Sequence, residues 1–386
     1  MTYPVPLLLF RLGDYLNYHQ QMLLTLLILG VACAILGCFL VLRRLSMVTD
    51  ALSHTILLGI ILAYFVTKDL DSPLLFVGAG LFGVFTVYCI ELLSSTGLVK
   101  NDDSVGITFP LFFSLAVILI STFARNVHID TDVVLMGQVI MIPLNNLEIF
   151  GIVLPKAMVY MTFMLLINLL FVTFFYKELK ISTFDPEFST IIGFSSGGLF
   201  YCLMTLTSFT AVSAFDAVGT MMAIALFVGP AASAYLITKD LKKMILVAIL
   251  YASVNTLIGF YLAIHINVSI SGMIATITGL SLILTTLFNR DGVITAIYLR
   301  DKSKRDFQLD LMIIHMGNHE NTPLAGEELG ITSMRYHLNW DQKTLGKKLK
   351  RLMNKGYVES DREKKIYRLT PKGKLRYDMI KLEYHM

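Results

Sequence analysis

Charged residues are scarce in this chain of 386 residues. Only 16% of the residues are Asp, Glu, Lys or Arg, while 55% are hydrophobic, and the mean hydropathy is +0.67. Soluble globular proteins carry roughly 25% charged residues, so the composition excludes an ordinary soluble protein. We therefore predict a polytopic membrane protein.

Cysteine is rare as well. The four cysteines lie inside apolar runs and share no ligand spacing or framework pattern, which argues against disulfides and cysteine metal sites; they are Cys33, Cys38, Cys89 and Cys202. We expect them to be small buried hydrophobic side chains.

Two motifs are absent. No G-x-x-x-x-G-K-[ST] run occurs, so the chain cannot hydrolyse ATP through a P-loop of its own. The N-terminal segment has neither a charged start nor an A-x-A cleavage site, so we do not interpret it as a removed signal peptide.

Long apolar runs are the dominant feature that is present. Runs near the roughly 20 residues needed to cross a bilayer predict nine spans, at residues 21–42, 50–67, 73–94, 105–124, 149–175, 198–217, 218–237, 244–264 and 270–289. The division between the sixth and seventh spans rests only on Asp216 and Gly219. Loops assigned to the inner side hold eight Lys and Arg residues and outer segments hold four, so the N-terminus is predicted outside and the C-terminus in the cytoplasm.

Charge is divided unevenly along the chain. Residues 1–300 hold 14 Lys/Arg and 16 Asp/Glu, whereas residues 301–386 hold 18 and 12. We predict a transmembrane domain at 1–295, a linker at 296–305 and a cytoplasmic domain at 306–386.

Asp50 and His54 stand near the start of the second predicted span. Residues four apart share one face of a helix, and a carboxylate with an imidazole can hold one divalent cation. Charged side chains inside a bilayer are costly and are usually functional. A structural alternative is that Asp50 caps the helix and His54 bonds to a neighbouring helix.

The surrounding residues resemble a known family. The stretch "GCFLVLRRLSMVTDALSHTILLGI" is similar to the signature of the permease subunit of manganese/zinc/iron ABC importers. Further matches follow in the same order, namely "DDSVGI", "VVLMGQVI", "FDPEFSTIIGF", "AVGTMMAIALFVGPAASAYLIT", "SGMIATITG" and "RDGVI". The resemblance covers roughly residues 20 to 295 and implies the fold of a type II ABC importer permease.

The resemblance assigns roles to several residues. It implies that Asp50 and His54 are membrane-embedded metal ligands. It also implies that a cytoplasmic segment docks on a separate ATPase chain; the segment comprises Phe184, Asp185, Pro186, Glu187 and Phe188. The sequence departs from the family pattern at Thr49, Leu58 and Ser271, where Gly, Pro and Pro are usual, so details of the gate do not carry over.

Other acidic and histidine residues are weaker candidates. Asp216 lies near an outer turn, where it either helps to receive a cation or faces water. The outer loop containing His128, Asp130 and Asp132 is interpreted as hydrated. His315, His319 and Glu320 lack a clear ligand pattern and are interpreted as ordinary surface residues.

The C-terminal region resembles a winged helix of bacterial regulators, a small α+β fold. We expect helices near 305–317, 325–330 and 340–355, a two-stranded wing within 357–369 and a last helix opened by Pro371. Basic residues of this region are candidates for contacts with phosphate groups. They are Lys347, Lys348, Lys350, Arg351, Lys355, Lys364, Lys365 and Arg368. The alternative partners of this region are DNA, the membrane surface and the ATPase.

We therefore predict an all-α permease subunit of an ABC importer for Mn, Zn or Fe in the bacterial plasma membrane, with a winged-helix extension. Its expected partners are an ATPase, an extracytoplasmic metal-binding protein and a second permease chain, in a homodimer or heterodimer. No permanent cofactor is expected, only the transported metal. The alternatives are a membrane-anchored metal-responsive transcription regulator, an importer of a chelate such as a siderophore, and an energy-independent carrier.

Overall fold

The computed structural model describes residues 17–69, 72–123, 139–149, 152–290, 292–320, 322–323, 325–361 and 366–384. By packing, the chain divides into two compact units, Met1–Arg290 and Asp291–Met386. Several residues singled out above lie outside the described residues, namely His128, Asp130, Asp132, Lys364 and Lys365. The predicted linker, 296–305, is helical, and the predicted domain boundaries stay a prediction.

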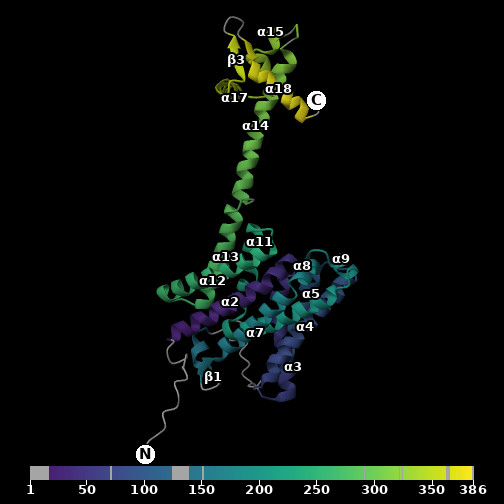
Figure 1. Cartoon of the computed structure of the whole chain (residues 1–386), viewed down its shortest axis with the longest axis vertical. Helices are drawn as coiled ribbons and strands as arrows, with labels where there is room; N and C mark the ends of the chain where they lie inside the picture. Colours follow the sequence, from purple (N-terminus) through teal and green to yellow (C-terminus); the bar gives the residue numbers. More distant parts are fainter. Residues whose placement is uncertain are drawn as a thin grey trace, which may run out of the picture. The chain divides into compact units, whose positions relative to one another are not determined.

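Nine helices in the described chain are long and apolar enough to cross a membrane, which confirms the predicted number (Figure 1). In the first unit these are α2 (Tyr18–Leu42), α3 (Ser46–Thr67), α4 (Pro73–Ser95), α5 (Asn101–Phe123), α7 (Lys156–Phe174), α10 (Ser196–Val218), α11 (Thr220–Ile237), α12 (Leu241–Ile266) and α13 (Ile270–Phe288). Shorter elements are η1 (Val139–Leu144), α8 (Tyr176–Phe184) and α9 (Pro186–Ile191).

The start of the fifth predicted span was wrong. Among the described residues there, 149 and 152–155 are not helical, because β1 (Asn146–Ile149) pairs antiparallel with β2 (Ile152–Pro155) and α7 begins only at Lys156. A short apolar run has the same appearance in a buried strand and in a helix, so periodicity alone did not separate them.

The division between the sixth and seventh spans is confirmed. α10 ends at Val218 and α11 begins at Thr220, with Gly219 between them at φ +81° and ψ 167°. Only glycine adopts this backbone conformation readily, because it has no Cβ. The single glycine therefore breaks an apolar run that would otherwise continue as one helix.

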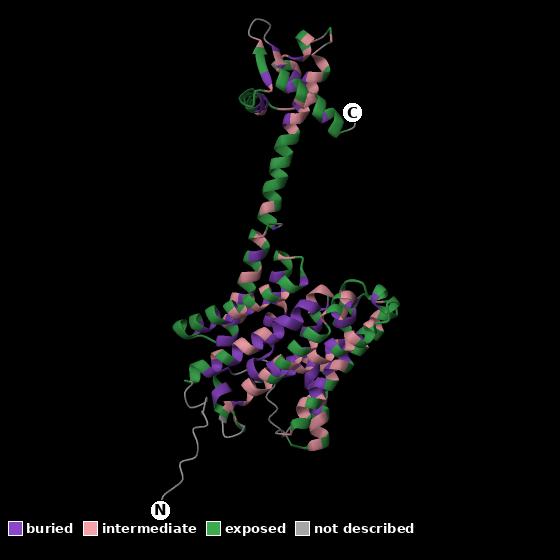
Figure 2. Ribbon diagram, in the orientation of Figure 1, coloured by how far each residue is buried: buried purple, intermediate pink, exposed green. Residues whose placement is uncertain are grey.

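The first unit is organised around α2. This helix packs against α7, α11 and α12, while α3 packs against α4 and α5. Figure 2 shows buried residues along the inner helices and exposed residues on the outer ones. Outer helices such as α5 and α7 are apolar on their exposed sides too, as membrane spans are. Of the cysteines, Cys33 and Cys38 are buried as expected, whereas Cys202 is exposed.

The second unit is mostly helical. It contains α14 (Val293–His319), α15 (Ala325–Glu328), α16 (Ile331–Leu338), α17 (Gln342–Asn354), β3 (Val358–Asp361), β4 (Ile366–Leu369) and α18 (Pro371–Glu383). β3 and β4 form an antiparallel pair with Val358 opposite Leu369. An apolar core of its own includes Met312, Met316 and Leu352. Helix α16 was not predicted from the sequence.

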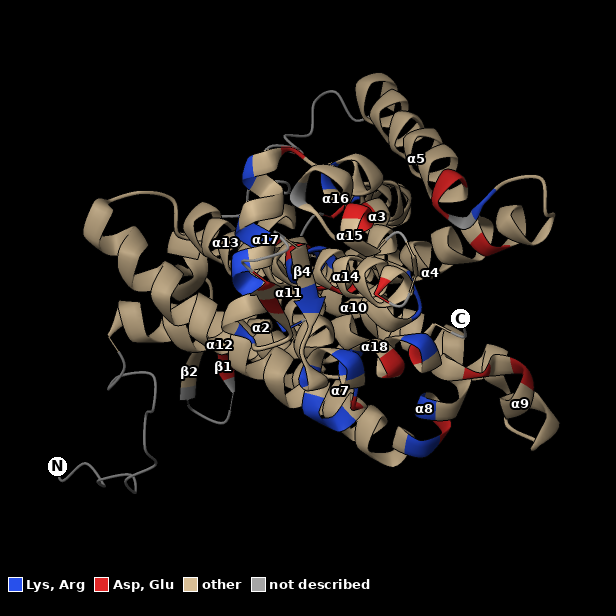
Figure 3. Ribbon diagram, turned by 90° about the horizontal axis from the view of Figure 1, so that it is seen from above, with Lys and Arg blue, Asp and Glu red and all other residues tan. Residues whose placement is uncertain are grey.

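Charged residues are concentrated in the second unit. In Figure 3 the helices of the first unit are tan over most of their length, whereas α17 carries several basic residues. On α14, Asp310 accepts two hydrogen bonds from the guanidinium of Arg376 in α18, at 3.2 and 2.7 Å. This bidentate pair joins the two helices, and it raises the pKa of Arg376.

Candidate metal site on helix α3

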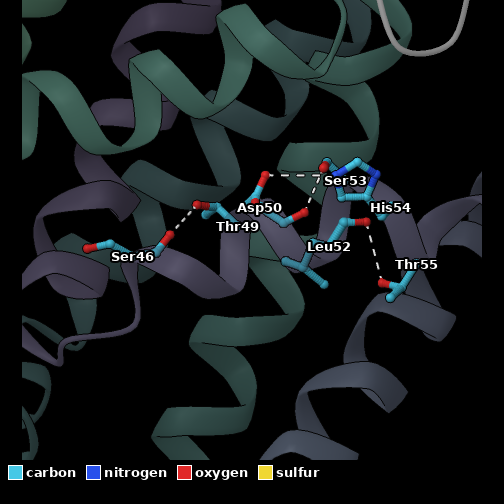
Figure 4. Close-up of polar contacts among 7 residues, drawn as sticks. All are labelled: Ser46, Thr49, Asp50, Leu52, Ser53, His54 and Thr55. Atoms are coloured by element: carbon cyan, nitrogen blue, oxygen red, sulfur yellow. Dashed lines mark hydrogen bonds and ion pairs between the residues drawn. The ribbon is translucent and has the colours of Figure 1, made fainter. Parts of the chain in front are cut away.

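Helix α3 presents Asp50 and His54 on one face. Asp50 lies about one turn inside the helix and His54 one turn further, and Figure 4 shows their side chains pointing toward each other. The distance from Oδ1 of Asp50 to Nε2 of His54 is 4.0 Å. Because α3 begins at Ser46 after Leu45, Asp50 does not cap the helix, and the capping alternative was wrong.

The imidazole of His54 is held by two aromatic rings of α5. It stacks on Phe109 with ring centroids 5.4 Å apart, and it meets Phe113 edge-on at the same centroid distance. These contacts restrict the orientation of the ring without using its nitrogen atoms. Both nitrogens of His54 are therefore left for polar partners.

The pair is accessible and supplies only two ligand atoms. The side chain of Asp50 is 56% exposed and that of His54 is 31% exposed. Within the part of the chain that the structure describes, no further His, Cys, Asp or Glu joins them in a potential metal-binding group. Among the described residues, Asp50 and His54 are therefore the two acidic or imidazole ligands at this position.

Hydroxyl side chains next to the pair form hydrogen bonds with the backbone of α3. Thr49 is buried and donates its hydroxyl proton to the carbonyl of Ser46 at 2.7 Å, and Ser53 donates to the carbonyl of Asp50 at 2.6 Å (Figure 4). The side-chain oxygens of Asp50 are not used in these bonds. Thr49, which departs from the family pattern, therefore leaves the candidate ligands free.

The predicted ATPase-coupling segment forms two short helices. Asp185 separates α8 from α9 and caps α9 by accepting the backbone N–H of Phe188 at 2.9 Å, and Pro186 is the first residue of α9. Phe184 is 58% exposed and Phe188 49% exposed. Pro186 and Glu187 thus form the first turn of α9.

Arg43 links α8 to the corner between α2 and α3, a contact that the sequence analysis missed. Its guanidinium donates to the hydroxyls of Ser182 and Thr183 in α8, at 2.9 and 3.2 Å. Arg43 follows Leu42, the last residue of α2, and stands three residues before Ser46, the first residue of α3. In the sequence, the adjacent Arg43 and Arg44 helped only to predict which side of the membrane their loop faces.

The other predicted residues lie elsewhere. Asp216 is exposed in the last turn of α10. On and after α17, Lys347, Arg351 and Lys355 are exposed. Lys348 is buried, packs over the ring of Trp340 at 4.9 Å and donates to Gln308, so it does not share their surface. Burial lowers the pKa of Lys348.

Comparison with known proteins places the chain in a family. Residues 15–289 match the ABC 3 transport family. The zinc transport system membrane protein TroD of Treponema pallidum is 40% identical over 355 residues, covering 92% of this chain and 96% of that protein. The manganese transport system membrane protein MntD of Bacillus subtilis is 36% identical, covering 72% of this chain and 95% of that protein.

A solved structure is also similar. PsaBC from Streptococcus pneumoniae in complex with Fab matches with a TM-score of 0.60 and 26% identity, covering 72% of this chain and 93% of that one. The alignment with TroD is longer than the first unit, so that similarity continues into the second unit. The chain therefore belongs to the ABC 3 transport family.

Proposed function

We propose that the chain is the membrane permease subunit of an ABC importer for a divalent transition-metal ion, and that Asp50 and His54 bind this ion in transit. The observation that carries the proposal is the pair itself, a carboxylate and an imidazole 4.0 Å apart on one face of a membrane helix. Family membership supports it, since TroD is a zinc transport protein and MntD a manganese transport protein. The chain is a transport subunit and not an enzyme, and ATP hydrolysis belongs to a separate chain.

The geometry of the pair suits a metal of this class. Bonds of about 2.0–2.2 Å from a metal to nitrogen and oxygen place two ligand atoms roughly 3 Å apart, so small side-chain rotations bring the pair from 4.0 Å into position. One oxygen and one nitrogen ligand are compatible with Mn²⁺, Fe²⁺ and Zn²⁺. With two such ligands among the described residues, the ion would be held weakly enough to leave, as transport requires.

Movement of the ion would be driven through α8 and α9. We infer that Phe184 and Phe188 enter a depression on the ATPase, because two large exposed aromatic rings flank a rigidly capped turn. Hydrogen bonds from Arg43 to α8 then transmit closure of the ATPases to the start of α3. Access to Asp50 and His54 would change with the position of α3. Asp216 is proposed as a further residue of the pathway, in an outer position.

We propose that the chain works in a larger assembly. A second permease chain, identical or homologous, would complete the assembly, with two ATPases and an extracytoplasmic metal-binding protein. In this assembly the N-terminus lies outside and the C-terminus in the cytoplasm, as the distribution of Lys and Arg favours.

For the second unit we infer a winged-helix domain. The order of α14, α16 and α17 followed by the β3–β4 hairpin and α18 supports this interpretation. α17 and its C-terminal end carry a basic surface formed by Lys347, Arg351 and Lys355. Its alternative partners are the ATPase, an anionic membrane surface and DNA.

The test is metal accumulation in cells that express the chain with its cognate ATPase. Asp50→Asn and His54→Ala are compared with wild type at matched membrane levels, with the exposed residues Asp301→Asn and His265→Ala as controls. We expect uptake of one among manganese, zinc and iron to fall at least about tenfold in both site variants, since even loss of a supporting group at a metal site costs about 10–100-fold. Unchanged uptake would make the pair structural and favour a chelate importer or a regulator.

A further inference from the structure

Three histidines and one glutamate gather in the second unit. His315 and His319 lie one turn apart at the end of α14, Glu328 ends α15, and His337 lies near the end of α16. Each residue offers one ligand atom, and these four atoms all lie within 4.8 Å of one another. Three separate helices thus bring nitrogen and oxygen donors to one point.

The spacing is close to that of a metal site. Tetrahedral zinc, with bonds of about 2.0–2.2 Å, places its ligand atoms roughly 3.3 Å apart. Nδ1 of His337 and Oε2 of Glu328 are already 3.2 Å apart. The widest pair needs to close by about 1.5 Å to reach tetrahedral spacing, which side-chain rotation supplies without movement of the helices.

Supporting groups surround these side chains. The hydroxyl of Ser333 donates to Oε2 of Glu328 at 3.2 Å, and Nε2 of His315 lies 3.3 Å from the carbonyl oxygen of Glu328. Backbone carbonyls and hydroxyls in such positions orient metal ligands and select the imidazole tautomer.

A purely structural explanation accounts for only part of the cluster. An ion pair between His337 and Glu328 needs neither His315 nor His319. The ring centroid of His315 lies 4.7 Å from that of His319 and 5.4 Å from that of His337, so three imidazoles meet at one point. A shared cation would use all four side chains. Glu320, considered from the sequence, instead pairs with Lys374 at 3.0 Å.

We propose that His315, His319, Glu328 and His337 form a binding site for a divalent transition-metal ion, best matched by Zn²⁺. Three imidazoles and one carboxylate are a donor set that zinc uses in proteins. The site lies in a different packing unit from Asp50 and His54 and does not depend on their role in transport. A bound ion would join α14, α15 and α16, so metal stabilises this part of the unit.

Zinc binding to the full-length chain in detergent tests the proposal. The parent protein carries Asp50→Asn and His54→Ala, so zinc measured by equilibrium dialysis and elemental analysis excludes ions held by the pair on α3. We expect one zinc ion per chain in the parent. His337→Ala and Glu328→Gln should each weaken binding by at least about tenfold, whereas the exposed control His265→Ala should leave it unchanged.

Amide hydrogen exchange supplies an independent readout. Zinc should slow exchange in residues 325–338 of the parent and have no such effect in Glu328→Gln, whose side chain keeps the shape of glutamate. Exchange of each variant without metal is its own baseline, because His337→Ala also removes the 3.2 Å contact with Glu328. Zinc binding that survives both variants, or a parent that binds no zinc, would overturn the proposal.

Discussion

The guanidinium of Arg43 donates a hydrogen bond of 2.9 Å to the hydroxyl of Ser182. Arg43 stands at the corner between α2 and α3, and Ser182 is buried in α8, next to the segment proposed to meet the ATPase. A second bond to Thr183 holds the same guanidinium. The contact joins α8, at the proposed coupling segment, to the corner that precedes the helix with Asp50 and His54.

Arg43→Lys should therefore reduce metal uptake while the assembled transporter still hydrolyses ATP. Lysine keeps the charge but cannot reproduce the two-donor fork of arginine, and loss of one hydrogen bond to a charged group costs about 1.5–3 kcal/mol. The measurement is uptake and ATPase activity side by side in reconstituted vesicles. Arg44→Lys is the matched control, since Arg44 is the exposed neighbour. Equal losses of uptake and hydrolysis in Arg43→Lys would contradict the interpretation.

Phe188→Ala should weaken binding of the ATPase chain. If the ring, which is 49% exposed here, becomes buried against the ATPase, its loss costs about 1.5–3 kcal/mol, or roughly tenfold or more in affinity. Co-purification of the ATPase over a range of concentrations measures this effect. Phe163→Ala removes an exposed ring from α7 and should leave ATPase binding intact. Equal retention of the ATPase by the two variants would count against the coupling role.

Gly37→Ala should destabilise the first unit. A Cβ at this position of α2 would lie 1.9 Å from the carbonyl oxygen of Phe227 in α11, so the two helices would have to separate. Overpacking of this kind costs about 1–3 kcal/mol. Thermal unfolding in detergent is the measurement, with Gly279→Ala as the control because a Cβ there meets nothing within 4 Å. A midpoint equal to that of the control would show that the helices adjust freely.

Acid should loosen the start of α17. Hydrogen bonds from Thr344 lower the pKa of Asp341, which caps this helix. The stabilisation is therefore complete above the ordinary Asp pKa of about 3.9 and is lost as the pH falls through the lower folded value. Hydrogen-exchange protection of 342–354 should fall across this interval. Asp341→Asn, which still caps the helix, should lack this acid dependence, and an unchanged dependence would assign it to another group.

Much of the membrane unit could be predicted from the sequence. The thickness of a bilayer requires long apolar runs, and apart from the start of the fifth span the predicted ends lie within four residues of the observed ones. Gly219 marked a break between two helices that hydrophobicity alone would have merged. The start of the fifth span was predicted incorrectly because a short apolar strand, here β2, resembles the end of a span.

The candidate site on α3 was predicted because its spacing is local. Asp50 and His54 are four residues apart, and helical geometry alone brings them to one face. The capping alternative needed the structure, since only the observed start of α3 at Ser46 separates a cap from an interior residue. The aromatic support from Phe109 and Phe113 comes from α5 and depends on how the helices pack.

By itself, the sequence determined the class of protein, the number of spans and the local pairs, because these follow from hydrophobicity and helical period. Tertiary structure decided which distant residues meet. His337 lies 18 residues beyond His319, and only the packing of α16 beside α14 brings it to the cluster. Arg43 reaches Ser182 across 139 residues for the same reason. Contacts between helices depend on the three-dimensional fit of side chains, for which a linear pattern contains no direct signal.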